Sequence, residues 1–339
     1  MEKRFTAQRW AASVAVCAVV ALVAFALSAA LGEQPLDFAE VGRAGSTDEL
    51  IFFSLRLPRV VLAALVGAAL AASGATLQSL LRNPLADPFV LGVSGGAALG
   101  ATVALAFGIT AAASIPGLAA VSSLALLGAL GASALVLLVG RLAGGNGPNT
   151  TLLAGVIFNA FALAAITFIK ALVAPDKLGE ILFWLAGSLG QESWRTLAVT
   201  GSAVAVCLLV LTALGPRLNL LTLGSEDAQS LGVDVRSTRR WALMTASVAV
   251  ALVVSLSGLV GFVGLLVPQL VRLVFGADQR LSVPASAFLG AAFLMLADLA
   301  ARLLFRVFHT EPPVGVITAL LGGPLFLGLM ARRSRTLSV

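Results

Sequence analysis

The sequence predicts an all-α polytopic membrane protein with about ten transmembrane helices in a single domain, residues 1–339. Of its 339 residues, 59% are hydrophobic and only 11% are charged, whereas a soluble domain usually carries about 25% charged residues. The mean hydropathy is +1.02, and apolar runs long enough to cross a bilayer recur along the chain. Backbone groups in lipid must be hydrogen-bonded within their own segment, which favours helices. Short alternating strands, typical of a membrane β-barrel, are not found.

The first apolar run follows Lys3, Arg4 and Arg9 and is longer than the roughly 7–15 residues of a signal-peptide core, so we interpret it as a transmembrane helix. Nine further apolar runs are long enough, or nearly long enough, to cross a bilayer. The ten expected spans are residues 10–31, 60–81, 90–113, 115–140, 151–174, 197–214, 241–261, 262–275, 281–305 and 314–330.

Charge places both termini in the cytoplasm. Ten spans put the two ends on one side, and most of the 22 basic residues fall in loops on that side. The opposite side holds an acidic loop, residues 32–57, with five carboxylates. Cytoplasmic loops are the ones enriched in Lys and Arg. The net charge of +6 comes from arginines scattered among loops, which is typical of cytoplasmic arginines that orient membrane helices. We therefore expect membrane lipid, and no nucleic acid, among the partners.

Small residues indicate close helix packing, and as a set they suggest a pathway. Gly92, Gly96 and Gly100 recur at four-residue spacing, which lets helix backbones approach one another. Gly264 and Pro268 interrupt the region of the seventh and eighth spans, and broken helices at membrane depth need a covering of protein or a cavity. A weak internal sequence repeat predicts two loosely related halves, as in many transporters.

The longest cytoplasmic loop, residues 215–240, contains a short predicted helix. Its serine can cap the N-terminus, two acidic residues suit the positive helix end, and a glycine can close it. Alanine and leucine at three-residue spacing would share one face. So short a helix needs a partner surface, and the alternatives are an ordered loop or a docking element for a cytoplasmic protein. The residues concerned are Ser225, Glu226, Asp227, Ala228, Leu231 and Gly232.

Catalytic and metal chemistry is not expected in this chain. A nucleotide-binding P-loop ends in Gly-Lys-Ser/Thr, and none of the three lysines follows a glycine. Cys17 and Cys207 lie inside apolar runs, and His309 is the single histidine. We therefore predict neither an enzyme nor a resident metal or cofactor. Any ATP, with its magnesium, would bind a separate subunit.

Asp298 and Arg302 are four residues apart on the ninth span and can pair along one helix face. Intramembrane acids often mark ion relays. One acid with a local partner does not supply the chain of carboxylates that proton-coupled transport requires.

Several motifs resemble the permease subunits of bacterial type II ABC importers for iron chelates and vitamin B12. The resemblance covers nearly the whole chain in family order. It is carried by Arg56-Leu57-Pro58-Arg59, Gln78, Arg82-Asn83-Pro84-Leu85-Ala86-Asp87-Pro88, Leu91-Gly92-Val93-Ser94, Trp184 to Leu189, Leu231-Gly232-Val233, Gly261 to Pro268, Ala297-Asp298 and Pro313 to Ala319.

This resemblance implies a ten-helix subunit of the bacterial inner membrane that dimerises with a second copy around a central pathway. It implies two ATP-binding subunits that engage residues 225–232, and a periplasmic or lipid-anchored binding protein. Arg56, Arg59 and Arg302 match positions that receive glutamates from the binding protein. Their alternative roles are anchoring at the membrane interface and, for Arg302, the pair with Asp298.

The sequence departs from the family pattern where Gln269 follows Pro268 in place of a histidine, where Gln279 stands in an Asp-His-Arg element, and where Pro312 replaces a leucine. The resemblance implies import of an iron–siderophore complex, or of haem or a cobalamin. The alternatives are an ion-coupled secondary transporter of a small organic solute and a membrane scaffold that transports nothing.

Overall fold

A computed structural model describes residues 6–43, 45–109, 118–142 and 148–337, and every regular element in these ranges is helical. The principal helices are α1 (Ala7–Ala30), α4 (Leu57–Leu80), α5 (Val93–Ala106), α6 (Ala120–Leu142), α7 (Pro148–Leu172), α8 (Pro175–Leu185), α9 (Trp194–Ala213), α10 (Gly215–Leu223), α11 (Ser225–Ser230), α12 (Val235–Ser257), α13 (Val263–Phe275), α14 (Gln279–Phe308) and α15 (Val314–Leu337). Two short helices, α2 (Phe38–Val41) and α3 (Thr47–Leu50), precede α4.

Within the described ranges, seven helices are long and apolar enough to cross a membrane, and three shorter ones are also apolar. The three are residues 93–106, 263–275 and 314–329. Each of the ten expected spans coincides with one of these helices. The all-helical membrane fold is confirmed, while the relation between the two halves stays a prediction.

The limits of several helices differ from the expected ones for local reasons. The second membrane helix begins early, because α3 and a π-helical segment (Ile51–Arg56) run without a break into α4. The third begins late, because a 3-10 turn (Pro88–Leu91) ends at Gly92, whose φ is +80°. That helix ends at Ala106, so residues 107–109 of the expected span are not helical. Residues 110–117 lie outside the described ranges.

Helix α12 also begins earlier than expected, because the Asp234 side chain accepts a hydrogen bond from the backbone N–H of Ser237 and caps the helix. Besides the short α2 and α3, two longer helices were not predicted as separate elements. Helix α8 lies in the loop before α9, and α10 occupies the first part of the long loop of residues 215–240.

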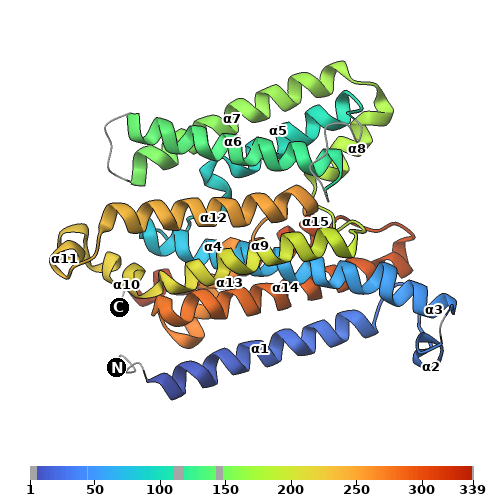
Figure 1. Cartoon of the computed structure of the whole chain (residues 1–339), viewed down its shortest axis with the longest axis horizontal. Helices are drawn as coiled ribbons and strands as arrows, with labels where there is room; N and C mark the ends of the chain where they lie inside the picture. Colours follow the sequence, from blue (N-terminus) through green and yellow to red (C-terminus); the bar gives the residue numbers. More distant parts are fainter. Residues whose placement is uncertain (1–5, 44, 110–117, 143–147, 338–339) are drawn as a thin grey trace.

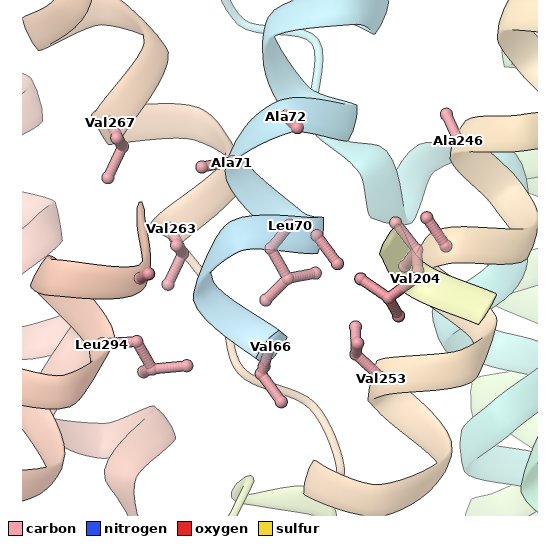
Figure 2. Packing of buried hydrophobic residues seen from close by; sticks show 14 of the residues in the cluster. Val66, Leu70, Ala71, Ala72, Val204, Ala246, Val253, Val263, Val267 and Leu294 are labelled. Carbon is pink, nitrogen blue, oxygen red and sulfur yellow. The ribbon is translucent and has the colours of Figure 1, made fainter. Parts of the chain in front are cut away.

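Helix α4 is the centre of the bundle. It packs against α9, α12, α13 and α14, and Figure 2 shows Val66 and Leu70 of α4 among side chains from these neighbours. Both residues are fully buried. A core of this kind depends on small residues, because it brings five helices together with few bulky side chains between them.

The remaining helices flank this centre. Figure 1 shows α5, α6 and α7 as a layer on one side and α1 on the opposite side, packed along α14. Helix α1 begins, and α15 ends, at the end of the bundle that carries α10 and α11, whereas α2, α3 and α8 lie at the other end. Exposed leucines and valines of α1, such as Leu22 and Val19, present an apolar surface suited to lipid.

Glycines set the closest helix contacts. A Cβ atom added at Gly67 would lie 2.2 Å from the carbonyl oxygen of Gly290 in α14. One added at Gly74 would lie 1.9 Å from the carbonyl oxygen of Gly264 in α13. The backbones of α4, α13 and α14 therefore touch directly at these positions.

Candidate docking, coupling and pathway sites

A buried ion cluster joins α4 to α14 at the end of the bundle opposite the termini. The Arg59 side chain donates from Nε and Nη2 to Oδ1 of Asp298, at 2.9 and 2.8 Å. Arg302 Nε lies 2.9 Å from the other carboxylate oxygen, Oδ2. Asp298 is completely buried. The expected pair of Asp298 with Arg302 is confirmed, and a second arginine, 239 residues away along the chain, shares the same carboxylate.

Glu311 extends this cluster towards the surface. It lies in the connection between α14 and α15 and pairs with Nη2 of Arg59. Arg59 is thus held between a fully buried carboxylate and one that is about one-third exposed.

Three arginines hold the C-terminal end of α1. Arg56 donates to the carbonyl oxygens of Ala30 (3.0 Å) and Gln34 (2.6 Å), and Arg302 donates to that of Ser28 (3.0 Å). Arg306 donates to the carbonyl oxygens of residues 32 and 33, at 2.7 and 3.0 Å. The last carbonyl groups of a helix have no partner inside the helix and carry its negative dipole end. Arg56 and Arg302 supply those partners, and Arg306 holds the two residues beyond the helix end, so that α1 is attached to α4 and α14.

These contacts bear on the predicted docking role of Arg56, Arg59 and Arg302. Arg56 is 6% exposed and Arg302 is 5% exposed, and Arg59 already binds two carboxylates. All three side chains are therefore engaged in bonds within the chain. That they also receive glutamates from a partner stays a prediction, and such a partner would have to compete with bonds already made.

The predicted coupling segment is a helical hairpin of α10 and α11. Glu226 and Asp227 occupy the first turn of α11, as expected. The predicted cap is wrong, because Gly224 is the residue that precedes the helix and its φ of +152° suits glycine. The hydroxyl of Ser225 instead accepts a hydrogen bond from Arg239 of α12, at 2.8 Å.

Ala228 and Leu231 do not share one face. Ala228 is fully buried, whereas Leu231 is 58% exposed. The reason is that α11 ends at Ser230, and Leu231 lies beyond the last helical residue. Gly232, with φ of +84°, ends the segment as expected. Leu231 is therefore an exposed apolar side chain, and its contact with an ATP-binding subunit stays a prediction.

Polar contacts connect the coupling segment to the bundle. Asn219 of α10 donates to Asp278 at 2.6 Å and accepts from the backbone N–H of Gln279 at 2.7 Å, at the start of α14. Arg82, which follows α4, donates to the carbonyl oxygen of Leu221 at 2.6 Å. A displacement of α10 would therefore act directly on the ends of α4 and α14.

Gly92, Gly96 and Gly100 do not form one stripe. Gly92 lies before α5, where its positive φ ends the 3-10 turn. Gly96 and Gly100 lie in α5 against α6, and a Cβ added at either would be 2.2 Å from a carbonyl oxygen of α6. Within this chain these two glycines pack helices together. That they line a pathway stays a prediction, as it does for Ser94, whose hydroxyl donates to the Phe89 carbonyl oxygen at 3.3 Å.

Gly96→Leu should force α5 and α6 apart, because the leucine side chain would overlap Gly128 and Ala132 of α6. We expect a lower melting temperature and little transport. The control is Gly131→Leu, at a helical position with open space around it. If the Gly96→Leu protein is destabilised but still transports at the full rate, Gly96 serves helix packing and does not line the pathway.

Helix α13 contains a proline whose structural cost is offset by a neighbouring helix. Pro268 has no N–H to donate to the carbonyl group of Gly264, four residues earlier. The buried side chain of Gln78, in α4, donates to that carbonyl oxygen at 3.2 Å and to that of Leu265 at the same distance. Gly264 also packs closely against Pro88 and the backbone of Leu70. Helices α4 and α13 are thus joined at the turn of α13 where Pro268 removes a backbone hydrogen bond.

A model of the FecCD transport family matches residues 20–332. The chain belongs to the FecCD transport family. Its hemin transport relative HmuU from Yersinia pestis is 41% identical over 324 residues, covering 93% of this chain and 94% of the relative. A cobalamin import permease, BtuC from Halobacterium salinarum, is 43% identical over 289 residues, covering 85% of this chain and 75% of the relative.

A solved structure of a metal-chelate type ABC transporter in an inward-facing conformation is also similar. Its TM-score is 0.84 at 31% sequence identity, and the match covers 94% of this chain and 98% of that one. The resemblance read from the motifs is confirmed. The chain is a multi-pass membrane permease of an ABC importer family, which removes the ion-coupled transporter and the scaffold as alternatives.

One departure from the FecCD pattern has a structural role. Gln269, in place of the usual histidine, donates to the carbonyl oxygen of Pro84 at 2.8 Å and to the side-chain oxygen of Gln78 at 3.1 Å. It thereby ties α13 to the loop after α4. In that loop, the Asp87 carboxylate accepts a hydrogen bond from the Phe89 N–H, and desolvation raises the pKa of this carboxyl above its ordinary value.

Two residues of these sites escaped the sequence reasoning. Glu311 could have been found from its place directly before the Pro-Pro-Val-Gly element that carries part of the resemblance. Arg306 lies four residues after Arg302, so it projects from the same helix face. Nothing in the sequence indicates that its targets are carbonyl groups of the chain directly after α1.

Proposed function

We propose that this permease is the membrane-spanning subunit of an ATP-driven importer that carries an iron–siderophore complex, or a related metal chelate such as haem or cobalamin, to the cytoplasm. The observation that carries the proposal is the match to hemin and cobalamin permeases at 41% and 43% identity over most of the chain. Relatives named for an iron chelatin and for ferric dicitrate point to the same class of cargo.

The proposal includes the partners that the family resemblance implies. A second copy of this chain forms the pathway, two ATP-binding subunits with Mg-ATP engage α10 and α11, and a periplasmic or lipid-anchored binding protein delivers the cargo. The permease lies in the bacterial inner membrane with both termini in the cytoplasm. This orientation is supported by the basic loops on the terminal side and by the position of α10, α11 and both termini at one end of the bundle.

The test is transport by the reconstituted complex. The permease, its ATP-binding subunits and the partner binding protein are placed in proteoliposomes and offered labelled ferric siderophores, haem and cobalamin. We expect one of these chelates to bind the binding protein and to accumulate only when ATP is supplied. Accumulation driven by a proton or sodium gradient without the ATP-binding subunits would contradict the proposal.

Leu231→Asp should uncouple ATP hydrolysis from transport. Leu231 is exposed in the free chain, so the change should leave the permease folded, and an exposed substitution typically alters stability by about 0.5 kcal/mol or less. In the complex the aspartate would bury a charge against the ATP-binding subunit. We expect at least a tenfold loss of uptake, measured alongside ATPase activity.

Leu50→Asp serves as the matched control for this variant. Leu50 is equally exposed, at 58%, but lies in α3 at the opposite end of the bundle. Normal uptake and complex assembly in Leu231→Asp would exclude this residue from the coupling contact.

A further inference from the structure

A cavity of about 1250 Å³ opens at the end of the bundle that carries the termini. It lies between the end of α6 and the start of α7 on one side and the first turns of α12 on the other, with the end of α4 at its floor. In Figure 1 this is the end where the α6–α7 layer faces α12 and α11. None of the predicted pathway residues and none of the predicted docking arginines line this cavity. The coupling segment, residues 225–232, contributes Gln229 to the lining.

The walls of the cavity are apolar and its rim is cationic. The walls include Leu80, Leu91, Leu137, Leu152, Leu243 and Met244. The rim contains Arg236, Arg239 and Arg240, all on the first two turns of α12. This division suits a molecule with an anionic head and an apolar body.

The positive charge of two rim arginines, Arg236 and Arg240, is not balanced within the described part of the chain. Arg236 and Arg240 are exposed and take part in no ion pair among the described residues. Asp234 is the one acidic residue in the lining, and its carboxylate already caps α12. Arg82 lies close enough to Arg239 for their charges to repel. The N-terminal dipole of α12 adds further positive potential.

The position of the cavity matches the boundary between headgroups and acyl chains. Helix α12 starts its membrane span at Val235, so the arginines lie at the water-facing end and the leucines lie deeper. Trp241, next to Arg240, is 55% exposed, and exposed tryptophans are enriched at this boundary. Basic pockets between membrane helices on the cytoplasmic side are suited to anionic lipid head groups.

We propose that this cavity binds an anionic phospholipid of the leaflet that faces the termini. The phosphate lies against Arg236, Arg240 and the first turn of α12, and an acyl chain lies along Leu137, Leu152 and Met244. The apolar walls favour a lipid over a free phosphate ion, because a free ion would leave them in contact with water. The bound lipid supports the α6–α7 pair against α12.

The experiment uses the full-length permease in nanodiscs of phosphatidylcholine, into which phosphatidylglycerol with brominated acyl chains is introduced. Binding next to Trp241 should quench tryptophan fluorescence, and brominated phosphatidylcholine at the same mole fraction should quench it less. Arg236→Gln with Arg240→Gln should weaken the preference for phosphatidylglycerol by roughly 10- to 30-fold, because each arginine near an anionic surface contributes about 1 kcal/mol.

The matched control is Arg217→Gln. Arg217 is exposed on α10 at the same end of the bundle and does not line the cavity. Equal quenching by the two lipids, or an unchanged preference in the double variant, would overturn the proposal. Reversal of the quenching by millimolar inorganic phosphate would assign the site to a free anion. If the double variant loses its ATP-binding subunits without any change in lipid preference, the arginines belong to that protein contact instead.

Discussion

Asp298→Asn should destabilise the permease more than any other single change at the buried ion cluster. The carboxylate is completely buried and holds Arg59 and Arg302 on opposite oxygens. Its neutralisation leaves the buried Arg302 guanidinium without its counter-ion and leaves Arg59 with Glu311 alone, and breaking a buried pair in this way typically costs about 3–5 kcal/mol. The measurement is thermal unfolding of the purified permease in nanodiscs.

Two further variants make this result specific. Asp298→Glu keeps the charge and should recover part of the lost stability. Glu40→Gln removes an exposed pair with Arg43, and exposed pairs contribute about 1 kcal/mol or less, so this variant should unfold close to the native temperature. Equal melting temperatures for Asp298→Asn and Glu40→Gln would mean that the cluster contributes no stability.

Gly74→Ala should produce the second large effect, through backbone contact rather than charge. The added methyl group would lie 1.9 Å from the carbonyl oxygen and 2.6 Å from the carbonyl carbon of Gly264. These are backbone atoms of α13, so no side chain can move aside, and overpacking of a close contact typically costs about 1–3 kcal/mol or more. We expect a lower melting temperature together with a loss of uptake, because α13 would shift away from Gln78.

Gly131→Ala provides the comparison for this prediction. Gly131 lies inside α6 with no atom near its added Cβ, and alanine is favoured over glycine in helix interiors by up to about 1 kcal/mol. The control should therefore be neutral or slightly stabilising. If Gly74→Ala behaves in the same way, α4 and α13 are not in the direct contact described here.

The hydropathy of the sequence predicted the existence and order of the ten apolar helices, because that property depends only on local composition. It could not predict the helix limits at Gly92 or Asp234, where a positive φ and a side-chain cap decide the start. Asp298 and Arg302 were predicted to pair because helical geometry places residues four apart on one face. Arg59 and Glu311 reach the same cluster through tertiary folding, which no local pattern encodes.

In the coupling segment, too, some features were predictable from the sequence and others were not. Its place in the chain and its acidic first turn were predictable from the sequence. The cap was not, because glycine and serine stand next to each other at residues 224 and 225 and both are common at helix starts. In the structure Gly224 precedes α11, and the Ser225 hydroxyl accepts a hydrogen bond from Arg239 of another helix instead of capping α11.

The arginines that hold the end of α1 have a consequence for biosynthesis. Helix α1 leaves the ribosome before α14, and Arg302, which donates to the Ser28 carbonyl oxygen, is made some 270 residues later. Until α14 has entered the bilayer, α1 lacks its principal packing partner, and Arg56 is the one of these arginines that can reach its last carbonyl groups. Helix α1 is therefore inserted well before it is fully secured. Chains interrupted before residue 302 should hold α1 only loosely and offer it to membrane proteases.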